Sequence, residues 1–382
     1  MSALSKGEDI ISISSLEKSF ANEQVLRGID FTVKPGEFCV VVGPSGSGKS
    51  TLLKTIAGVV SFDNGSIRLD GENVDDVPVE DRNLGYVFQD FEERLFPHMT
   101  VGENVAFGLH QSDESFSEAE IDEKIDEVLD MLAIGETKNS KPSELSGGQQ
   151  QRVELARQLV RECDVMLLDD PLADLDYKLQ KRMELEMRRI HNSMGSTFVY
   201  VTHNQDQALK LADKLVVMNH GMIEQVGTPD EVYRRPETAF VGRFIGDSNP
   251  LLGTVRETTA THTVVDTPQG DVVAEAHNGP FPDGTETMVL IRPENITIGN
   301  EAATKENTFA ATVVGRTYTG EETEFSVSIG EDTEEFQIVV TGNVPLEAIG
   351  DQTTIGWDAT DAIAYDTLSV VDTVTVDDLM EV

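Results

Sequence analysis

The nine residues 43–51, GPSGSGKST, restrict the fold of this chain more than any other segment. They follow the apolar run FCVVV and lead into KSTLLKTIAG, which reads as a helix. Glycines at positions 43, 46 and 48 let the backbone turn its N–H groups inward, and the start of the helix adds a positive end. We therefore predict a strand, a phosphate-binding loop and a helix in succession.

In this loop, Lys49 is expected to reach the β- and γ-phosphates of a nucleoside triphosphate, and Ser50 to offer its hydroxyl to Mg²⁺. A glycine-rich turn that matches by chance is the alternative, and the flanking strand and helix argue against it. The loop alone does not separate GTPases, kinases and recombinases from other classes. The predicted nucleotide-binding residues of the loop are Gly43, Pro44, Ser45, Gly46, Ser47, Gly48, Lys49, Ser50 and Thr51.

The pattern of apolar residues divides the chain into two parts. From residue 11 to about 245, short apolar runs such as DVMLLDD and TFVYVTH alternate with segments of helical period, which indicates an α/β fold with a mainly parallel sheet. After FIGDSNPLLG the helical patterns nearly vanish and strand-like segments follow. We predict an α/β domain over residues 1–245 and a small β-barrel-like domain over residues 246–382.

The charge of the chain excludes some classes of partner. With 69 acidic and 29 basic residues, the net charge is −40 at pH 7. The electrostatic field of so negative a chain repels phosphate groups, which argues against a general nucleic-acid or anionic-lipid binder. The carboxylates are spread along the chain rather than gathered in a disordered tail, so we expect a halophilic surface that stays soluble in high salt.

Two further features bear on the compartment. Cys39 and Cys163 have neither metal-ligand nor redox-pair spacing, so each is expected to be a buried free thiol. No apolar stretch is long enough to span a bilayer, and the N-terminus MSALSKGEDI lacks the apolar core of a signal peptide. We expect a cytosolic chain that attaches to a membrane only through a partner.

A second motif narrows the class of nucleotide-binding protein. The segment ELSGGQQQRVELARQLV places Ser-Gly-Gly at the start of a predicted amphipathic helix, which in isolation would indicate helix capping. The chain carries, in order, the phosphate loop, Gln89 in GYVFQD, LSGGQ, MLLDD, and His203 in TFVYVTH. In this order the motifs closely resemble those of ATP-binding cassette ATPases. The resemblance implies a P-loop cassette domain that has a mainly parallel sheet with helices and an antiparallel β subdomain.

The resemblance implies a composite site. In that family two cassettes face each other with two ATP molecules between them, and the signature of one subunit touches the γ-phosphate held by the other. A chain with one cassette is thus expected to form a homodimer. The signature residues here are Ser146, Gly147, Gly148 and Gln149.

The resemblance also assigns roles to single residues. Phe20 would stack on adenine, Gln89 would contact Mg²⁺ and the attacking water, and Asp169 would hold Mg²⁺ through water. His203 would hydrogen-bond the γ-phosphate, and residues 172–176 would cross to the other subunit. Without the motif context, a lone Phe is more often a core residue and a lone His at a strand end more often structural.

Asp170 departs from the family pattern. Most active members have Glu at this position, where it orients and polarises the attacking water. Aspartate sets the carboxylate back by about 1.5 Å, one C–C bond. Three alternatives stay open: slow hydrolysis with Asp170 as the base, full activity through a repositioned backbone, or a conformational switch that hydrolyses ATP poorly.

The remaining similarity concerns importers. LFPHMTVGENVAFGL resembles a segment of ATPases that serve polyamine, iron, sulfate and sugar permeases, and DSNPLLGTV and LIRPENITI resemble their transport-associated OB-fold domain. The implied partners are transmembrane permease subunits and, through them, an extracellular solute-binding protein. The implied location is the cytoplasmic side of the membrane. Polyamine is favoured as the solute, with iron(III), thiamine, sulfate and sugar open.

One insertion and two rival classes complete the comparison. After Gln89 the chain reads DFEERLF, two residues longer than the importer pattern, in the region that receives the permease's coupling helix.

Cassette proteins of DNA repair carry a long coiled coil and those of translation carry tandem cassettes. This chain shows neither feature, and its net charge argues against nucleic acid.

Overall fold

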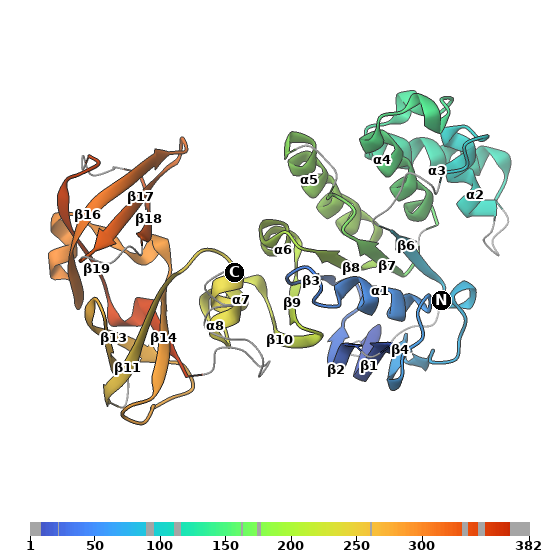
Figure 1. Ribbon diagram of the computed structural model, residues 1–382. Helices are drawn as coiled ribbons and strands as arrows, with labels where there is room; N and C mark the ends of the chain where they lie inside the picture. The colour runs from blue at the N-terminus through green and yellow to red at the C-terminus, as the bar shows by residue number, and fades with distance from the viewer. Residues whose placement is uncertain are drawn as a thin grey trace. The chain divides into compact units, whose positions relative to one another are not determined.

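The computed structural model describes residues 9–21, 23–88, 95–110, 116–161, 163–173, 177–259, 262–330, 335–342 and 348–366. The chain forms two compact units, Met1–Asp230 and Glu231–Val382 (Figure 1). No helix in the described ranges is both long enough and apolar enough to cross a membrane. Each unit has its own core and is described by itself below.

A six-stranded sheet organises the first unit, with strand order β10-β9-β3-β8-β7-β6. Neighbours from β9 to β6 are parallel, and β10 is antiparallel to β9. All residues of β3, β7 and β8 are buried, as expected for a parallel sheet covered on both faces. The strands are β3 (Phe38–Val42), β6 (Leu84–Val87), β7 (Val165–Asp169), β8 (Thr197–Thr202), β9 (Lys214–Asn219) and β10 (Met222–Gly227).

An antiparallel sheet of order β2-β1-β4-β5 belongs to the same unit. One apolar core contains Ile13 of β1, Ile56 of α1 and Leu167 of β7, so α1 joins the two sheets. The predicted α/β cassette fold with an antiparallel subdomain is confirmed. The strands are β1 (Ile11–Phe20), β2 (Glu23–Val33), β4 (Asn64–Leu69) and β5 (Glu72–Asn73).

The helices of the first unit follow the predicted periodicity. In α3 the buried residues are Ile121, Ile125, Val128 and Leu129, and Ser117 caps the helix in a capping box with Glu120. Contacts join α2, α3 and α4 into one helical subdomain (Figure 1). The helices are α1 (Lys49–Ala57), α2 (Val101–His110), α3 (Glu118–Met131), α4 (Gly147–Leu159), α5 (Tyr177–Met194) and α6 (Gln205–Leu211).

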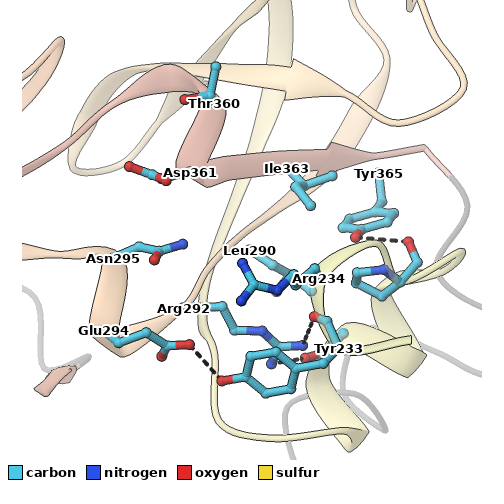
Figure 2. A pocket seen from close by; sticks show the side chains of 12 residues that line it. Tyr233, Arg234, Leu290, Arg292, Glu294, Asn295, Thr360, Asp361, Ile363 and Tyr365 are labelled. Atoms are coloured by element: carbon cyan, nitrogen blue, oxygen red, sulfur yellow. Dashed lines mark hydrogen bonds between the residues drawn. The ribbon is translucent and has the colours of Figure 1, made fainter. Parts of the chain in front are cut away.

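The second unit begins before the predicted boundary at residue 245. Two short helices, α7 (Pro229–Arg234) and α8 (Ala239–Phe244), precede its strands. Arg292 Nη1 donates to the carbonyl of Gly242 in α8 at 2.8 Å, and Tyr365 OH donates to the carbonyl of Pro236 at 3.1 Å. These bonds attach the two helices to the β domain (Figure 2), which explains why the second unit begins at Glu231 rather than after residue 245.

The β domain contains more than the predicted small barrel. Strands β11-β12-β13-β20-β14 close into a barrel, and β15-β19-β16-β17-β18 form a second sheet. One core includes Leu251 and Val272 of the barrel with Phe325 and Trp357 of the second sheet. The strands are β11 (Asn249–Thr258), β12 (Thr263–Thr267), β13 (Gly270–Ala276), β14 (Glu286–Ile291), β15 (Thr297–Ile298), β16 (Asn307–Tyr318), β17 (Glu322–Ile329), β18 (Glu335–Thr341), β19 (Gln352–Trp357) and β20 (Ala362–Tyr365).

Candidate nucleotide-binding site

The predicted phosphate loop joins β3 to α1. Gly46 and Gly48 adopt φ angles of 83° and 96°, in the left-handed region that favours glycine. A Cβ atom at Gly43 would lie 2.1 Å from the carbonyl oxygen of Met218 in β9. Larger residues at these positions would strain or displace the loop, so the glycine pattern is required by the local geometry.

Lys49 lies against this loop. Its ammonium donates to the carbonyl oxygens of Gly43 and Pro44, each at 2.8 Å, and to Ser47 Oγ at 3.3 Å. Burial lowers the pKa of Lys49, while the nearby carboxylates of Asp170 and Asp169 oppose that shift. The loop thus holds a buried ammonium, and the phosphate oxygens of a bound nucleotide would compete with the loop carbonyls for its hydrogen bonds.

Asp169 ends β7 and faces α1. Ser50 Oγ donates to Asp169 Oδ1 at 2.8 Å, and Tyr86 OH donates to Asp169 Oδ2 at 3.3 Å. The structure therefore brings together Ser50 and Asp169, two of the three predicted metal-site residues. Their hydroxyl and carboxylate oxygens are ligands that suit Mg²⁺. The third residue, Gln89, lies outside the described residues.

Asp170 has different partners. Its φ angle of 44° places it in the left-handed region, and its N–H donates to the carbonyl of Val201 at 2.9 Å. Oδ1 accepts from Thr202 Oγ1 at 3.2 Å, and Oδ2 lies 2.6 Å from His203 Nδ1. Burial raises the pKa of Asp170, whereas His203 and Thr202 act in the opposite direction.

A buried hydrogen-bond network supports Asp170. Gln207 Oε1 accepts from Tyr200 OH at 2.9 Å and lies 3.1 Å from Thr202 Oγ1. The N–H of Asn204 donates to Thr202 Oγ1 at 3.1 Å. A hydroxyl has one proton, so Thr202 donates to Asp170 or to Gln207 at any moment. Tyr200, Thr202 and Gln207 are fully or almost fully buried.

The sequence analysis missed this network and two further contacts. Thr202 is the polar last residue of the buried strand TFVYVT and directly precedes His203, and this position was the signal that the sequence offered. Tyr86, whose hydroxyl contacts Asp169, lies within β6, a short strand with no polar pattern. Gln151 Nε2 donates to the carbonyl of Pro171 and so joins α4 to the turn after Asp170.

The signature residues begin α4. Ser146 Oγ accepts from the N–H of Gln149 at 3.4 Å, and Gln149 Oε1 accepts from the N–H of Ser146 at 3.0 Å. Ser146 therefore caps α4, as the alternative interpretation of this segment predicted. Ser146 and Gly147 are also exposed, and the first N–H groups of a helix have no partner within it. The same turn therefore offers hydrogen-bond donors to an anion.

Phe20, the predicted adenine platform, ends β1. Its exposed fraction is 47%, and Lys18 Nζ lies 5.2 Å from the ring centroid. An aromatic ring with this exposure is not a core residue, and stacking on a base needs such a surface. Of the predicted crossing loop at 172–176, Leu172 and Ala173 are described, and residues 174–176 lie outside the described ranges.

Two family models match this sequence. Residues 26–173 match the model of the ABC transporter family, and residues 289–364 match that of the TOBE domain. The first match spans the phosphate loop, the signature and both aspartates. The second lies within the β domain.

Curated relatives cover most of the chain. It is 39% identical over 314 residues to the spermidine/putrescine import ATP-binding protein PotA of Vibrio vulnificus (strain YJ016), covering 82% of each chain. To PotA of Aliivibrio fischeri it is 40% identical over 319 residues, covering 83% of this chain and 84% of the relative.

Solved structures match the cassette unit. A dimeric post-hydrolysis structure of the ATP-binding cassette MJ0796, bound to ADP and Pi, has a TM-score of 0.53 and 29% identity, over 57% of this chain and 98% of that one. CbiO1 from Clostridium perfringens, part of an ABC transporter complex, has a TM-score of 0.54 and 30% identity, over 59% of this chain and 91% of that one. The chain therefore belongs to the family of ABC transporter ATP-binding proteins, in the group that includes PotA, with a cassette followed by a TOBE domain.

Proposed function

We propose that this chain is the ATP-hydrolysing subunit of an ABC importer that takes up polyamines through a partner permease. The relatives named PotA import spermidine and putrescine, and the chain covers more than four fifths of their length. The main support for ATPase activity is that the adjacent aspartates have different hydrogen-bond partners. Asp169 bonds to Ser50, whereas Asp170 bonds to Thr202 and His203.

In the proposed mechanism, Lys49 and the loop N–H groups bind the β- and γ-phosphates, and Phe20 stacks on adenine. Ser50 and Asp169, with Gln89, are the residues that would hold Mg²⁺. Bound Mg²⁺ supplies charge neutralisation on the phosphates. The cassette resemblance and the contact between Ser50 and Asp169 support these assignments.

Asp170 acts on the water in this scheme. The water oxygen bonds to the γ-phosphorus, the bond from that phosphorus to the β–γ bridging oxygen breaks, and Asp170 accepts the proton from the water. His203, whose Nδ1 is held by Asp170, is then placed to direct its other nitrogen toward the γ-phosphate. We propose slow but real turnover, because the aspartate carboxylate is shorter than the usual glutamate.

A homodimer would complete each site. The signature turn, Ser146 to Gln149, in which Ser146 and Gly147 are exposed, would contact the γ-phosphate bound by the partner copy; the dimeric structure of a similar cassette supports this proposal. Light scattering in high salt, with Mg²⁺-ATP and a variant slowed at Asp170, should then show a dimer. Monomers that persist at high protein concentration would contradict the composite site.

The permease would bind the helical subdomain. A groove of about 560 Å³ is lined by three aromatic rings, Phe88, Phe96 and Phe107, and by Arg157 and Arg161. Arg157 lies 5.7 Å from the ring centroid of Phe96. Phe88 and Phe96 flank residues 89–94 in the sequence, and those six residues lie outside the described ranges. Through this permease the chain would sit peripherally on the cytoplasmic side of the membrane, with a solute-binding protein outside.

Transport by the assembled importer tests this function. The chain would be co-purified with its permease and placed in vesicles, with ATP inside and with the solute-binding protein and radiolabelled spermidine outside. Spermidine uptake that needs ATP and fails in Asp170→Asn is expected. ATP-dependent uptake of another solute without spermidine would overturn the polyamine assignment and leave the ATPase assignment intact.

A further inference from the structure

The end of β1 that carries Phe20 lies near the phosphate loop. In the ladder between β1 and β2, Lys18 pairs with Leu26. A Cβ atom at Gly48 of the phosphate loop would lie 2.8 Å from the carbonyl oxygen of Val25 and 3.1 Å from Leu26 Cδ2. The phosphate loop therefore meets β2 opposite the last residues of β1, of which Phe20 is the final one.

These last residues extend past one of the strands that flank β1. The ladder between β1 and β4 ends at the pair Glu17 and Asn64, three residues before β1 ends at Phe20. On the other side, the pairing of β1 with β2 is irregular between Lys18 and Ser19. The segment that presents Phe20 is thus held less regularly by its neighbouring strands than the rest of β1.

Asp63, the residue before β4, contacts this segment with its side chain. Its backbone N–H donates to the carbonyl of Glu17 at 2.8 Å, which places Asp63 beside the strand end. Its carboxylate accepts from the N–H of Ser19 at 2.6 Å and from the ammonium of Lys18 at 3.3 Å. The bond from the Ser19 N–H is the main cause that lowers the pKa of Asp63, and Lys18 adds to it. One carboxylate therefore holds the two residues that precede Phe20.

Lys18 connects this carboxylate to the aromatic ring. The residue is only 8% exposed, although lysine is almost never buried unless it is paired. Its Nζ lies 3.3 Å from Asp63 Oδ1 and 5.2 Å from the ring centroid of Phe20, within the range of a cation–π contact. The ammonium therefore covers one face of a ring that is 47% exposed, which leaves the other face for a flat ligand.

We propose that Asp63 is a positioning residue for the adenine platform. Through Lys18 and the Ser19 N–H it fixes the end of β1, so that the open face of Phe20 is held in place for the base. This proposal rests on the stacking of adenine on Phe20 in the proposed function. Asp63 should contribute only to the part of the affinity that depends on the base, because its bonds go to β1 rather than to the phosphate loop.

Calorimetric titration of the full chain in molar KCl with two Mg²⁺-bound probes tests this proposal. AMP-PNP is a non-hydrolysable ATP analogue that carries the base, and inorganic tripolyphosphate has three phosphates without it. Asp63→Ala should weaken AMP-PNP binding by about fivefold, because it removes the bonds that hold the ring, and should leave the affinity for tripolyphosphate unchanged. Wild-type affinity for AMP-PNP, or an equal weakening of both probes, would overturn the proposal.

A conservative variant and a matched control complete the test. Asp63→Asn keeps an oxygen that can accept from the Ser19 N–H, so it should recover part of the lost affinity. Asp30→Ala removes another exposed carboxylate of the same sheet, one that accepts from the N–H of Ser15 at 2.9 Å, and it should bind both probes as the wild type does. Equal losses in Asp63→Ala and Asp30→Ala would indicate a general loosening of the sheet and would overturn the positioning role.

Phe20→Ala separates this proposal from the one on which it rests. It should weaken AMP-PNP binding by about tenfold, in the range expected for base stacking on an aromatic ring, with tripolyphosphate unchanged. If Phe20→Ala weakens AMP-PNP binding and Asp63→Ala does not, only the positioning role fails. If Phe20→Ala leaves AMP-PNP binding unchanged, the adenine platform fails and the role of Asp63 fails with it, whereas the assignment of the phosphate loop stands.

Discussion

Two regions meet at the end of β7, and they treat adjacent aspartates differently. On one side, Asp169 contacts the hydroxyls of Ser50 and Tyr86, both of which precede it in the sequence. On the other side, Asp170 contacts Thr202 and His203 at the end of β8. The left-handed φ of Asp170 turns the chain at this point. We therefore propose that one side serves the phosphate loop and its metal, and that the other serves the attacking water.

The largest effect is expected from a substitution that disables only the side serving the attacking water. Asp170→Asn keeps the size of the side chain and removes its ability to accept a proton. Turnover should fall by about 10² to 10⁴, the usual contribution of a positioned base. Phosphate release under saturating Mg²⁺-ATP measures it, and nucleotide affinity from a fluorescent ATP analogue serves as the control. Full turnover in this variant would show that Asp170 is not the base.

Asp170→Glu sharpens the same comparison. The longer side chain restores the usual carboxylate, so its turnover should equal or exceed that of the wild type if the turn has room. The partner at 2.6 Å, His203 Nδ1, defines how much room that is. A large loss of rate would indicate instead that the backbone has already placed Asp170 at the working distance.

The next effect concerns the loop that both sides share. Lys49→Ala removes a buried ammonium that the loop carbonyls already hold in place. ATP affinity should fall by about 10- to 100-fold, as expected for the loss of a hydrogen bond to a charged group. Equilibrium binding of ATP measures the change. Unchanged affinity would show that this loop does not bind the phosphates.

A smaller effect tests the network behind Asp170. Thr202→Val removes the hydroxyl that donates to Asp170 Oδ1, and kcat should fall about tenfold while KM for ATP stays close to that of the wild type. Since burial raises the pKa of Asp170, activity should already decline at a higher pH than for an ordinary aspartate. The variant should move this acidic limb higher still, because it removes a bond that favours the charged form.

Thr202→Ser is the matched control for that network, since it keeps the hydroxyl. It should recover both the rate and the position of the acidic limb. Equal losses in the Ser and Val variants would assign Thr202 a packing role only.

Salt dependence separates the two units. Beyond residue 250 the chain has four cations, and two of them, Arg256 and Lys305, pair with Asp271 and Asp358. Unscreened repulsion among the carboxylates should therefore loosen the β domain before the cassette. Melting followed by circular dichroism should rise from low to molar KCl, and hydrogen exchange at low salt should be fastest in the second unit. A constant melting temperature would rule out this adaptation.

The sequence predicted features that local patterns encode. The loop glycines, the helix with Ile121 and Val128, and the burial of Cys39 and Cys163 follow from spacing and composition, and the structure confirms them. The order of the motifs predicted the cassette, and the resemblance of DSNPLLGTV and LIRPENITI to importer sequences predicted the TOBE domain; the comparisons confirm both.

Features that depend on distant residues were not predictable in this way. The contact between Thr202 and Asp170 needs the ends of β7 and β8 to meet, and the hydrogen bond from Arg292 to Gly242 needs α8 to fold onto β14. The second five-stranded sheet also escaped prediction, because its strands resemble those of the barrel in pattern. Single-residue patterns carry no record of such pairings.

The claim that the two aspartates do different work is tested most directly by Mg²⁺-dependent ATP binding in Asp169→Asn and Asp170→Asn. ATP affinity would be measured for each variant with Mg²⁺ and with a chelator. We predict that Asp169→Asn loses the gain in affinity that Mg²⁺ gives the wild type, and that Asp170→Asn keeps it. Equal loss in both variants, or equal retention, would contradict the division between a metal side and a water side.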